Sequence, residues 1–421
     1  MTAHSEASSG RRKAALGFIF ATALMDVLSL GIIIPVLPNL MKELAGGSTA
    51  SAALWVGLFA SVWAFMQFFC SPILGLVSDR YGRRPVILIS IFGLGLDYLF
   101  MAFAPTLSWL FLGRIVHGVT AASFATASAY IADVTPPEKR AKSFGLIGAA
   151  WSVGFVVGPA LGGTLGEIDL RLPFFVAAGM ALTNWLYGYF ILPESLPPEK
   201  RESRFVWKKA NPLGSLTLLR SHKDLLGLAT LWLLYHLAHY VLPAIFVLYT
   251  GHRYGWSMQE VGLMLMVTGI LGVIVQAVLV GPIVKRIGER GALLLGMACG
   301  AIGFAIYGLA PTEEIYYVGM PIFALMGLVQ ASIQGLMTRR VQPHEQGQLQ
   351  GANSSIAGLT GMFGPALYTV VFAWSLRNEA TQHMPGLAIL VAAGLMALGF
   401  VLALRFAKAP DAMIAPKTSA D

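Results

Sequence analysis

Three ionisable residues lie inside segments that otherwise resemble membrane-spanning helices: Asp26, Asp97 and Arg114. A charge at the centre of a bilayer costs roughly 2.5–3.5 kcal/mol on insertion scales, so such residues need one another, water or a cation. Arg114 cannot discharge itself by losing a proton, and Asp26 and Asp97 are its candidate partners. We expect the two aspartates to exchange protons along a transport pathway, with Arg114 tuning their affinity. The alternative is a structural buried ion pair.

The composition predicts a membrane protein. The chain has 421 residues, of which 56% are hydrophobic and only 12% charged, about half the charge of a soluble protein. Apolar runs long enough to cross a hydrocarbon core of roughly 30 Å recur throughout, and only helices satisfy the backbone of such runs in lipid. The first run lacks a nearby cleavage site, so we expect a retained helix and not a signal peptide. The twelve predicted helices are 14–37, 54–77, 85–104, 107–131, 144–165, 173–192, 224–249, 259–281, 291–309, 316–337, 352–374 and 385–405.

The distribution of basic residues predicts the orientation. An even number of helices places both termini on one side, and 24 of the 29 Lys and Arg residues fall in the loops and tails of that side. The positive-inside rule therefore places both termini in the cytoplasm. This asymmetry also explains the net charge of +8 without a nucleic-acid partner.

An internal repeat divides the chain into two pseudo-symmetric halves. Two motifs recur at the same offset of 206 residues: the pattern 75–84 at 281–290, and Gly158-Pro159-Ala160-Leu161 at Gly364-Pro365-Ala366-Leu367. We therefore predict an N-terminal six-helix half at 1–192, a cytoplasmic linker at 193–223 and a C-terminal six-helix half at 224–421. Halves that rock around a midplane site are a known solution for alternating access.

These motifs resemble those of the major facilitator superfamily, and the match covers nearly the whole chain. The loop after the second predicted helix carries what we call the gate motif: Gly75, Asp79, Arg80, Gly82, Arg83 and Arg84. The resemblance implies that this loop latches a cytoplasmic gate. Its glycines allow a tight turn, Asp79 can accept from the amino end of a neighbouring helix, and the arginines can pair with carboxylates or carbonyls. A plain basic loop would explain the arginines but not this spacing.

Two further motifs are similar to those of the superfamily. Gly113-Arg114-Ile-Val-His117-Gly118 resembles its intramembrane arginine motif, with Arg114 and His117 on one helix face. The fifth predicted helix carries a pattern that is more frequent in antiporters than in symporters: Gly154, Gly158, Pro159 and Gly162. By physics alone this pattern is a packing face with a proline bend. The resemblance adds the expected direction of transport, in which substrate and coupling ion cross the membrane in opposite directions.

A narrower resemblance is to the tetracycline/proton antiporters. It rests on Asp26 with Gly31-x3-Pro35, on Asp97-Tyr98, Tyr130-Ile-Ala-Asp133 and Pro193-Glu194-Ser195, and on the run Gln346–Gly351. The resemblance places Gln276 and Gln334 near a substrate site, to which we add His117 as a candidate. It also implies a drug chelated to magnesium as cargo, so Mg²⁺ would arrive only as part of the substrate. We expect no resident cofactor or metal.

Two departures from that family concern the substrate. Where it has an essential Asp and a His, this chain has Gly300 and Gly272, which leaves no carboxylate in the interior of any C-terminal-half helix. We expect weaker or altered tetracycline transport, and expect a carboxylate restored at Gly300 to face the cavity. The seventh predicted helix has instead gained His236 and His239. They either take over coupling or substrate binding, because imidazole titrates near neutral pH, or they are structural.

The sequence thus predicts an all-α membrane transporter and not an enzyme. We expect a proton-coupled antiporter, functional as a monomer in the bacterial inner membrane, that exports a tetracycline-like or other hydrophobic drug and confers antibiotic resistance. The open alternatives are an exporter of an endogenous amphiphile, an uptake symporter, which the antiporter pattern opposes, and a non-transporting membrane sensor. Short loops leave no room for a signalling domain.

Overall fold

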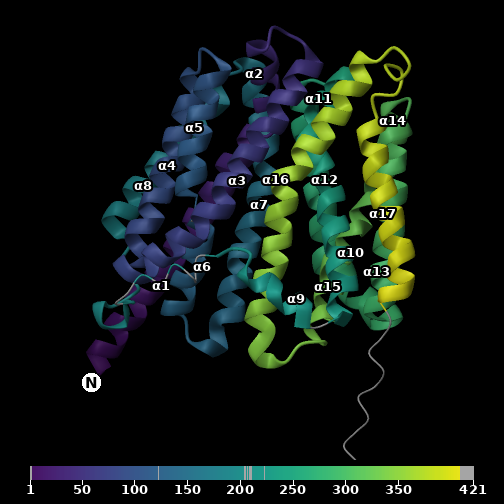
Figure 1. Cartoon of the computed structure of the whole chain (residues 1–421). Helices are drawn as coiled ribbons and strands as arrows, with labels where there is room; N and C mark the ends of the chain where they lie inside the picture. The colour runs from purple at the N-terminus through teal and green to yellow at the C-terminus, as the bar shows by residue number, and fades with distance from the viewer. Residues whose placement is uncertain are drawn as a thin grey trace, which may run out of the picture. The chain divides into compact units, whose positions relative to one another are not determined.

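The computed structural model describes residues 2–407 except 122, 203–204, 206, 208–210 and 222. Parts of the predicted linker 193–223 and of the C-terminal half therefore lie outside the described residues. The described secondary structure is entirely helical (Figure 1). The longer helices are α1 (Thr2–Ile33), α2 (Leu37–Leu44), α3 (Thr49–Tyr81), α4 (Arg83–Phe103), α5 (Leu107–Thr120), α6 (Ser123–Val134), α7 (Pro137–Ile168), α8 (Leu172–Ile191), α10 (Lys223–His239), α11 (Val241–Arg253), α12 (Met258–Ile274), α13 (Val280–Leu309), α14 (Glu313–Ala324), α15 (Leu328–Thr338), α16 (Gln346–Arg377) and α17 (Leu387–Phe406).

Shorter elements join or continue these helices. Helix α9 spans Thr217–Ser221, and the 3₁₀ turns among the described residues are η1 (Pro198–Lys200), η3 (Gly214–Leu216), η5 (Leu325–Gly327) and η6 (Pro343–Glu345). The stretch η4 (Val275–Leu279) is a π-helix between α12 and α13. A π-bulge inside a helix is frequent at functional sites.

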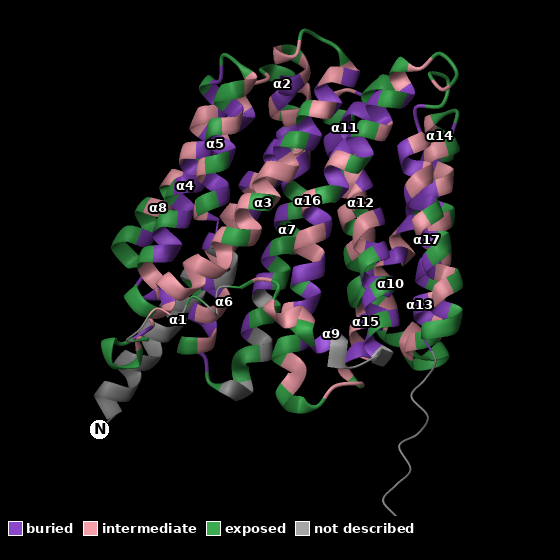
Figure 2. Cartoon of the chain, in the orientation of Figure 1, coloured by how far each residue is buried: buried purple, intermediate pink, exposed green. Residues whose placement is uncertain are grey.

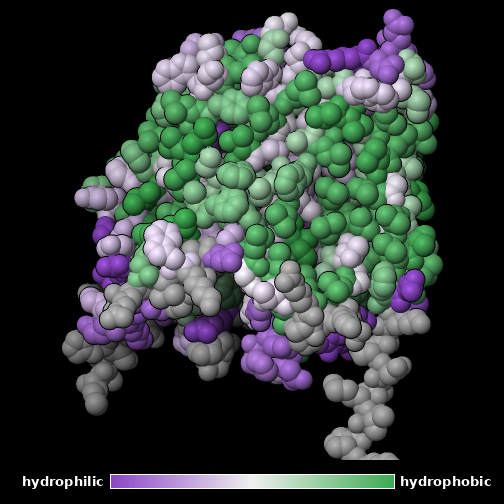
Figure 3. Space-filling view, in the orientation of Figure 1, coloured by the Kyte–Doolittle hydropathy of each residue, from purple (hydrophilic) through white to green (hydrophobic). Residues whose placement is uncertain are grey.

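Each predicted membrane span lies mostly on helix, with breaks at 34–36, 121 and 240. In the described part, nine helices are long and apolar enough to cross a membrane, or ten if the bent pair Ile19–Ile33 and Leu37–Leu44 is one span. Two features reduce this number below twelve: α5 and α6 share one predicted span, and the continuous stretch Met258–Leu309 covers two predicted spans and turns at Gly288. The chain is a multi-pass membrane protein, consistent with twelve helices. Hydrophobic side chains cover the middle of the visible helices, and hydrophilic ones gather at their ends (Figure 3).

Packing groups the chain into two compact units. The first comprises Met1–Pro212, Pro243–Ile270 and Gly361–Pro385, and the second Leu213–Leu242, Leu271–Thr360 and Gly386–Asp421. In the first unit, buried residues from α1, α4, α6 and α7 and the C-cap residue of α8 form one hydrophobic cluster: Ile19, Ile87, Ile91, Ala127, Tyr130, Ile131, Ile147 and Leu192. Figure 2 shows buried residues recurring along α4 between exposed ones. The boundaries of the two predicted halves stay a prediction.

Glycines let α7 pack directly on two helices, α1 and α12. A Cβ atom at Gly158 would lie 2.8 Å from Cα of Gly31 on α1. On another face of α7, the carbonyl of Pro159 lies where a Cβ atom of Gly262 on α12 would stand. The pattern is therefore a close-packing surface, as the sequence predicted, because only small residues allow two backbones this close.

Two apolar surface crevices support the internal repeat. The crevice in the first unit is lined by Leu96, Leu99, Phe100, Phe103, Pro105 and Trp109. The crevice in the second unit is lined by Ile302, Ala305, Ile306, Leu309, Ala310, Pro311 and Ile315. Each residue of the first set has a counterpart in the second at the offset of 206 that the two sequence motifs gave. The two halves therefore share local structure at these positions.

The packing of α7 on α1 predicts a contrast between two glycines of α7. Replacing Gly158 by Ala places a methyl group against the backbone of Gly31, which cannot swing aside as a side chain can. We expect Gly158→Ala to destabilise the protein by about 1–3 kcal/mol, the usual cost of overpacking. The matched control is Gly148→Ala, because Gly148 faces open space and alanine is the better helix former by roughly 0.5–1 kcal/mol. Thermal unfolding in detergent measures both, and equal melting temperatures would contradict this packing.

Candidate proton-coupling and substrate site

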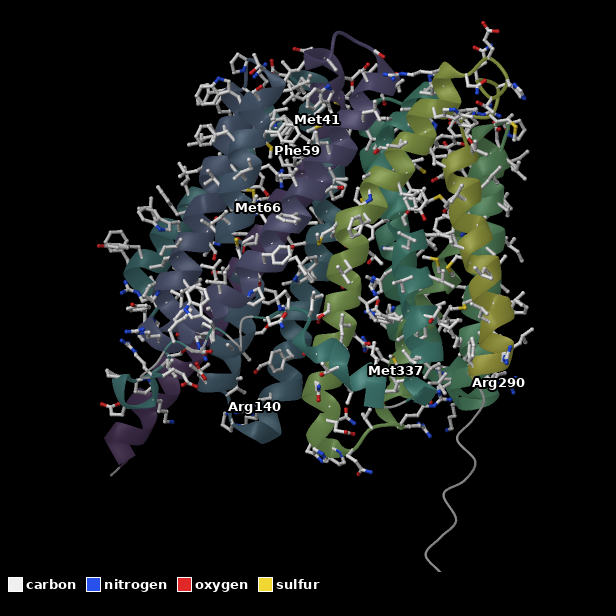
Figure 4. All side chains as sticks on the ribbon, in the orientation of Figure 1. Met41, Phe59, Met66, Arg140, Arg290 and Met337 are labelled. Atoms are coloured by element: carbon white, nitrogen blue, oxygen red, sulfur yellow. The ribbon has the colours of Figure 1, made fainter. Side chains whose placement is uncertain are left out.

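A buried ionic cluster joins α4 to α5. Nη2 of Arg114 lies 3.5 Å and Nδ1 of His117 lies 3.3 Å from the same oxygen, Oδ2 of Asp97. The side chain of Asp97 is 0% exposed. The Arg114 guanidinium also stands 4.5 Å from the ring centre of Phe59 on α3, a cation–π contact; Figure 4 labels this ring. The predicted partnership of Arg114 with an aspartate is thus present, and Asp97 is that partner.

Local sequence explains how the carboxylate reaches α5. Arg114 and His117 are three residues apart, so both side chains project from one face of α5. The adjacent Gly113 leaves room for the carboxylate, since a Cβ atom there would lie 2.8 Å from Oδ1 of Asp97. The intramembrane arginine motif therefore needs a glycine at position 113, because a side chain there would keep the Asp97 carboxylate away from α5.

Asp26 lies on α1 and is held by a residue that sequence analysis missed. Nδ2 of Asn184 on α8 donates to Oδ1 of Asp26 at 3.4 Å, and Thr22 Oγ1 donates to Oδ1 of Asn184 at 3.1 Å. Asn184 is 0% exposed. The sequence did carry a signal for Asn184: it is a lone amide inside the apolar run 172–191, and a buried amide needs hydrogen-bond partners. Its partner on α1 lies 158 residues away in the chain.

A cavity of about 260 Å³ in the first unit brings Asp26 and His117 to one space. Asp97 and Arg114 are absent from its lining, which consists of Thr22, Ala23, Asp26, Val27, Leu30, Trp63, Gln67, Ser71, Leu94, Tyr98, His117, Ala121, Ala127, Ile147 and Trp151. Ligand pockets usually measure roughly 300–1,000 Å³ and are mostly apolar with a few polar anchors. This cavity has that character but would enclose only part of a drug-sized molecule.

The gate motif forms an ionic network at one end of the first unit. Arg83 forms an ion pair with Asp79, and its Nε lies 3.2 Å from Oδ2 of Asp133 on α6. Arg84 donates from Nη2 to the carbonyl of Tyr189 at 2.6 Å. Arg80 instead lies over the ring of Tyr81, 5.4 Å from its centre. Two of the three arginines therefore pair as the sequence predicted.

The amino end of α4 is capped by Glu194 and not by the gate-motif aspartate. Its carboxylate accepts from the backbone N–H of Arg83 at 2.8 Å and of Arg84 at 3.2 Å. The N-cap residue Gly82 has a φ of 111° and no side chain to accept these bonds. Its missing Cβ also leaves the space that the Glu194 carboxylate fills. Asp79 pairs with Arg83, and an anion 111 residues further on caps α4. The expected role of Asp79 at the amino end of a neighbouring helix stays a prediction.

The other predicted substrate residues belong to the second unit. His236 stacks edge-on against Trp232 with 4.4 Å between ring centres, and His239 lies parallel to Tyr235 at 6.0 Å. Gln276 lies in the π-helix η4, where Nε2 donates to the carbonyl of Gly327 at 3.2 Å. Gln334 lies half-buried on α15. Their roles in substrate binding stay predictions.

A Cβ atom at Gly300 would point into neighbouring side chains, against the expectation that a carboxylate at this position faces the cavity. A Cβ atom there would meet Cε of Met396 on α17 at 2.7 Å and Cγ of Met326 in η5 at 2.9 Å. The position lies in a packed helix contact, where an anion would be surrounded by thioethers. A Cβ atom at Gly272 would meet nothing within 4 Å.

The two glycines therefore predict opposite responses to substitution. We expect Gly300→Asp to reduce the amount of folded protein in the membrane, since a carboxylate in an apolar contact costs roughly 2.5–3.5 kcal/mol on insertion scales. We expect Gly272→His to insert normally because its side chain enters open space. Fluorescence size-exclusion of detergent extracts measures both. Normal yield of Gly300→Asp with tighter binding of a magnesium–tetracycline chelate would restore the original expectation.

The capping of α4 gives a second prediction for this site. Loss of a helix cap costs about 0.5–2 kcal/mol, and loss of an anion at a helix amino end adds to it. We expect Glu194→Ala to speed hydrogen–deuterium exchange in the first turn of α4 and to lower thermal stability. The control is Glu199→Ala, a neighbouring exposed carboxylate in η1. If both variants exchange at the parental rate, Glu194 does not hold the start of α4.

Comparison with known proteins agrees with this architecture. Residues 19–365 match the family described as Major Facilitator Superfamily. The class C tetracycline resistance protein of Escherichia coli is 38% identical over 381 residues, 90% of this chain and 94% of that protein. The class B tetracycline resistance protein of Escherichia coli is 33% identical over 353 residues, which are 84% of this chain and 87% of that protein. The solved structure of the nucleoside transporter NupG, 14% identical, superimposes with a TM-score of 0.77 over 94% of this chain and all of that one, which shows the fold alone.

The chain therefore belongs to the Major Facilitator Superfamily and, within it, to the family of the tetracycline resistance proteins.

Proposed function

We propose that this protein exports a tetracycline-like or other hydrophobic drug across the bacterial inner membrane in exchange for protons, with both termini in the cytoplasm and the monomer as the functional unit. The observation that carries the proposal is the pair of acidic sites in the first unit: Asp26 on a mostly apolar cavity, and Asp97 buried against Arg114 and His117. Relatives named as tetracycline resistance proteins support a drug as the cargo.

The geometry supports proton coupling for an energetic reason. Ionisable groups inside a membrane are costly and are retained where protons or ions move. Asp97 has a permanent cation beside it, whereas Asp26 lies on the cavity beside aromatic side chains such as Trp63 and Trp151. One carboxylate is thus placed where a ligand or water reaches it, and the other where a proton must be delivered through protein. Alternating access would then expose the cavity to each side in turn.

Transport in inside-out membrane vesicles tests the proposal. We expect tetracycline uptake driven by a pH gradient in the parent, and at least about a tenfold loss in Asp26→Asn, since a positioned proton-transfer group contributes about 10²–10⁴ in rate. The amide keeps the volume of the carboxylate and can still accept from Asn184, so insertion should be normal. Glu379→Gln, at an exposed carboxylate, is the control. Unchanged gradient-driven uptake in Asp26→Asn would remove Asp26 from coupling, and absent uptake of every drug in a panel by the parent would refute drug export.

A further inference from the structure

His117 is the side chain that touches both the cavity and the buried ionic cluster. It lines the cavity that Asp26 also lines. Its Nδ1 lies 3.3 Å from Oδ2 of Asp97, which is itself 0% exposed and absent from the cavity lining. One imidazole therefore spans the distance between a space that can hold water or substrate and a carboxylate enclosed by protein.

Neighbouring side chains hold the ring in this position. The ring of Trp63 on α3 lies 6.0 Å from that of His117, and Gly118 brings α5 against Met66, a residue labelled in Figure 4. The charged and titratable groups around His117 are Asp97 and Tyr98 from α4, Arg114 from its own helix and Asp26 from α1. The cavity residues from α3 and α7 add tryptophan, glutamine, serine and isoleucine but no titratable group.

We propose that His117 relays protons between the cavity and Asp97. This proposal rests on the proposed function, and it names the route by which a proton reaches the carboxylate of Asp97. A carboxylate facing Nδ1 favours the tautomer that carries the proton there. In the loading step, a hydronium ion in the cavity gives a proton to Nε2 while the Nδ1–H bond breaks and an O–H bond forms on Asp97. One proton enters and one leaves the ring, so the imidazole stays neutral.

The release step is the reverse and closes the cycle. The protonated carboxyl of Asp97 returns its proton to Nδ1, and the Nε2 proton passes to water in the cavity. No rotation of the ring is required, because loading and release use the same two nitrogen atoms. Protonation of Asp97 also removes the negative charge that faces Arg114 at 3.5 Å. The proton load on His117 and Asp97 is therefore linked to the strength of the contact between α4 and α5.

The test separates proton movement from drug binding in purified protein reconstituted in lipid vesicles. The variant is His117→Gln, whose amide can donate to Asp97 but cannot accept and pass on a proton. We expect drug transport driven by a pH gradient, and drug-driven proton release, to fall at least about tenfold, because a positioned proton-transfer group contributes about 10²–10⁴ in rate. Drug-for-drug exchange at uniform pH should fall less than gradient-driven transport, since exchange needs no net proton movement. His383→Gln, at an exposed loop position, is the control.

The outcomes distinguish the relay from its alternatives. A parent that moves drug without protons, or moves no drug, refutes the proposed function itself. A parent that antiports and a His117→Gln variant with the parental rate and pH profile overturn the relay alone. A variant that loses drug affinity along with proton flux shows a substrate ligand in place of a relay. His117→Asn, tested in parallel, gives the same readouts with a shorter amide if His117→Gln is not recovered from the membrane.

Discussion

The charge of Arg114 is permanent, and it lies in a segment that must cross lipid. A guanidinium in such a place is tolerated only with an anion or water close by, and the structure meets this requirement with Asp97 at 3.5 Å and the face of Phe59 at 4.5 Å. Much of the first unit follows from this constraint. Helices α4 and α5 must lie in contact, Gly113 must lack a side chain, and α3 must bring an aromatic ring over the cation.

Missing side chains determine several of the contacts on which transport would depend. Glycine lets α7 approach α1 at Gly158, lets the Asp97 carboxylate approach α5 at Gly113, and leaves space for the Glu194 carboxylate at Gly82. Two of these three approaches bring an anion to its partners: Asp97 to Arg114, and Glu194 to the backbone N–H groups at the start of α4. The small residues therefore serve both helix packing and electrostatics, and a methyl group at any of them would separate the partners.

The candidate site residues described within the membrane interior differ between the two units. Asp26, Asp97, Arg114 and His117 all belong to the first unit, whereas the second unit contributes His236, His239, Gln276 and Gln334. A Cβ atom at Gly300 would meet the side chains of Met326 and Met396, so a carboxylate there would have to displace these thioethers. Carboxylates paired with arginine in the first unit, and imidazoles and amides in the second, are consistent with a division between coupling and recognition.

The sequence by itself determined the helices, the membrane location, the gate and antiporter motifs and the identity of the ionisable groups. These follow from hydropathy, from helical spacing and from the cost of charge in lipid, all of which are local properties. Only the tertiary structure decided that Asp97 pairs with Arg114, that Asn184 holds Asp26, that Glu194 caps α4 and that Gly300 packs against Met326 and Met396. The physical reason is that each of these contacts joins different helices. Sequence spacing specifies which residues share a helix face, but the neighbour of that face is chosen by packing across the whole unit.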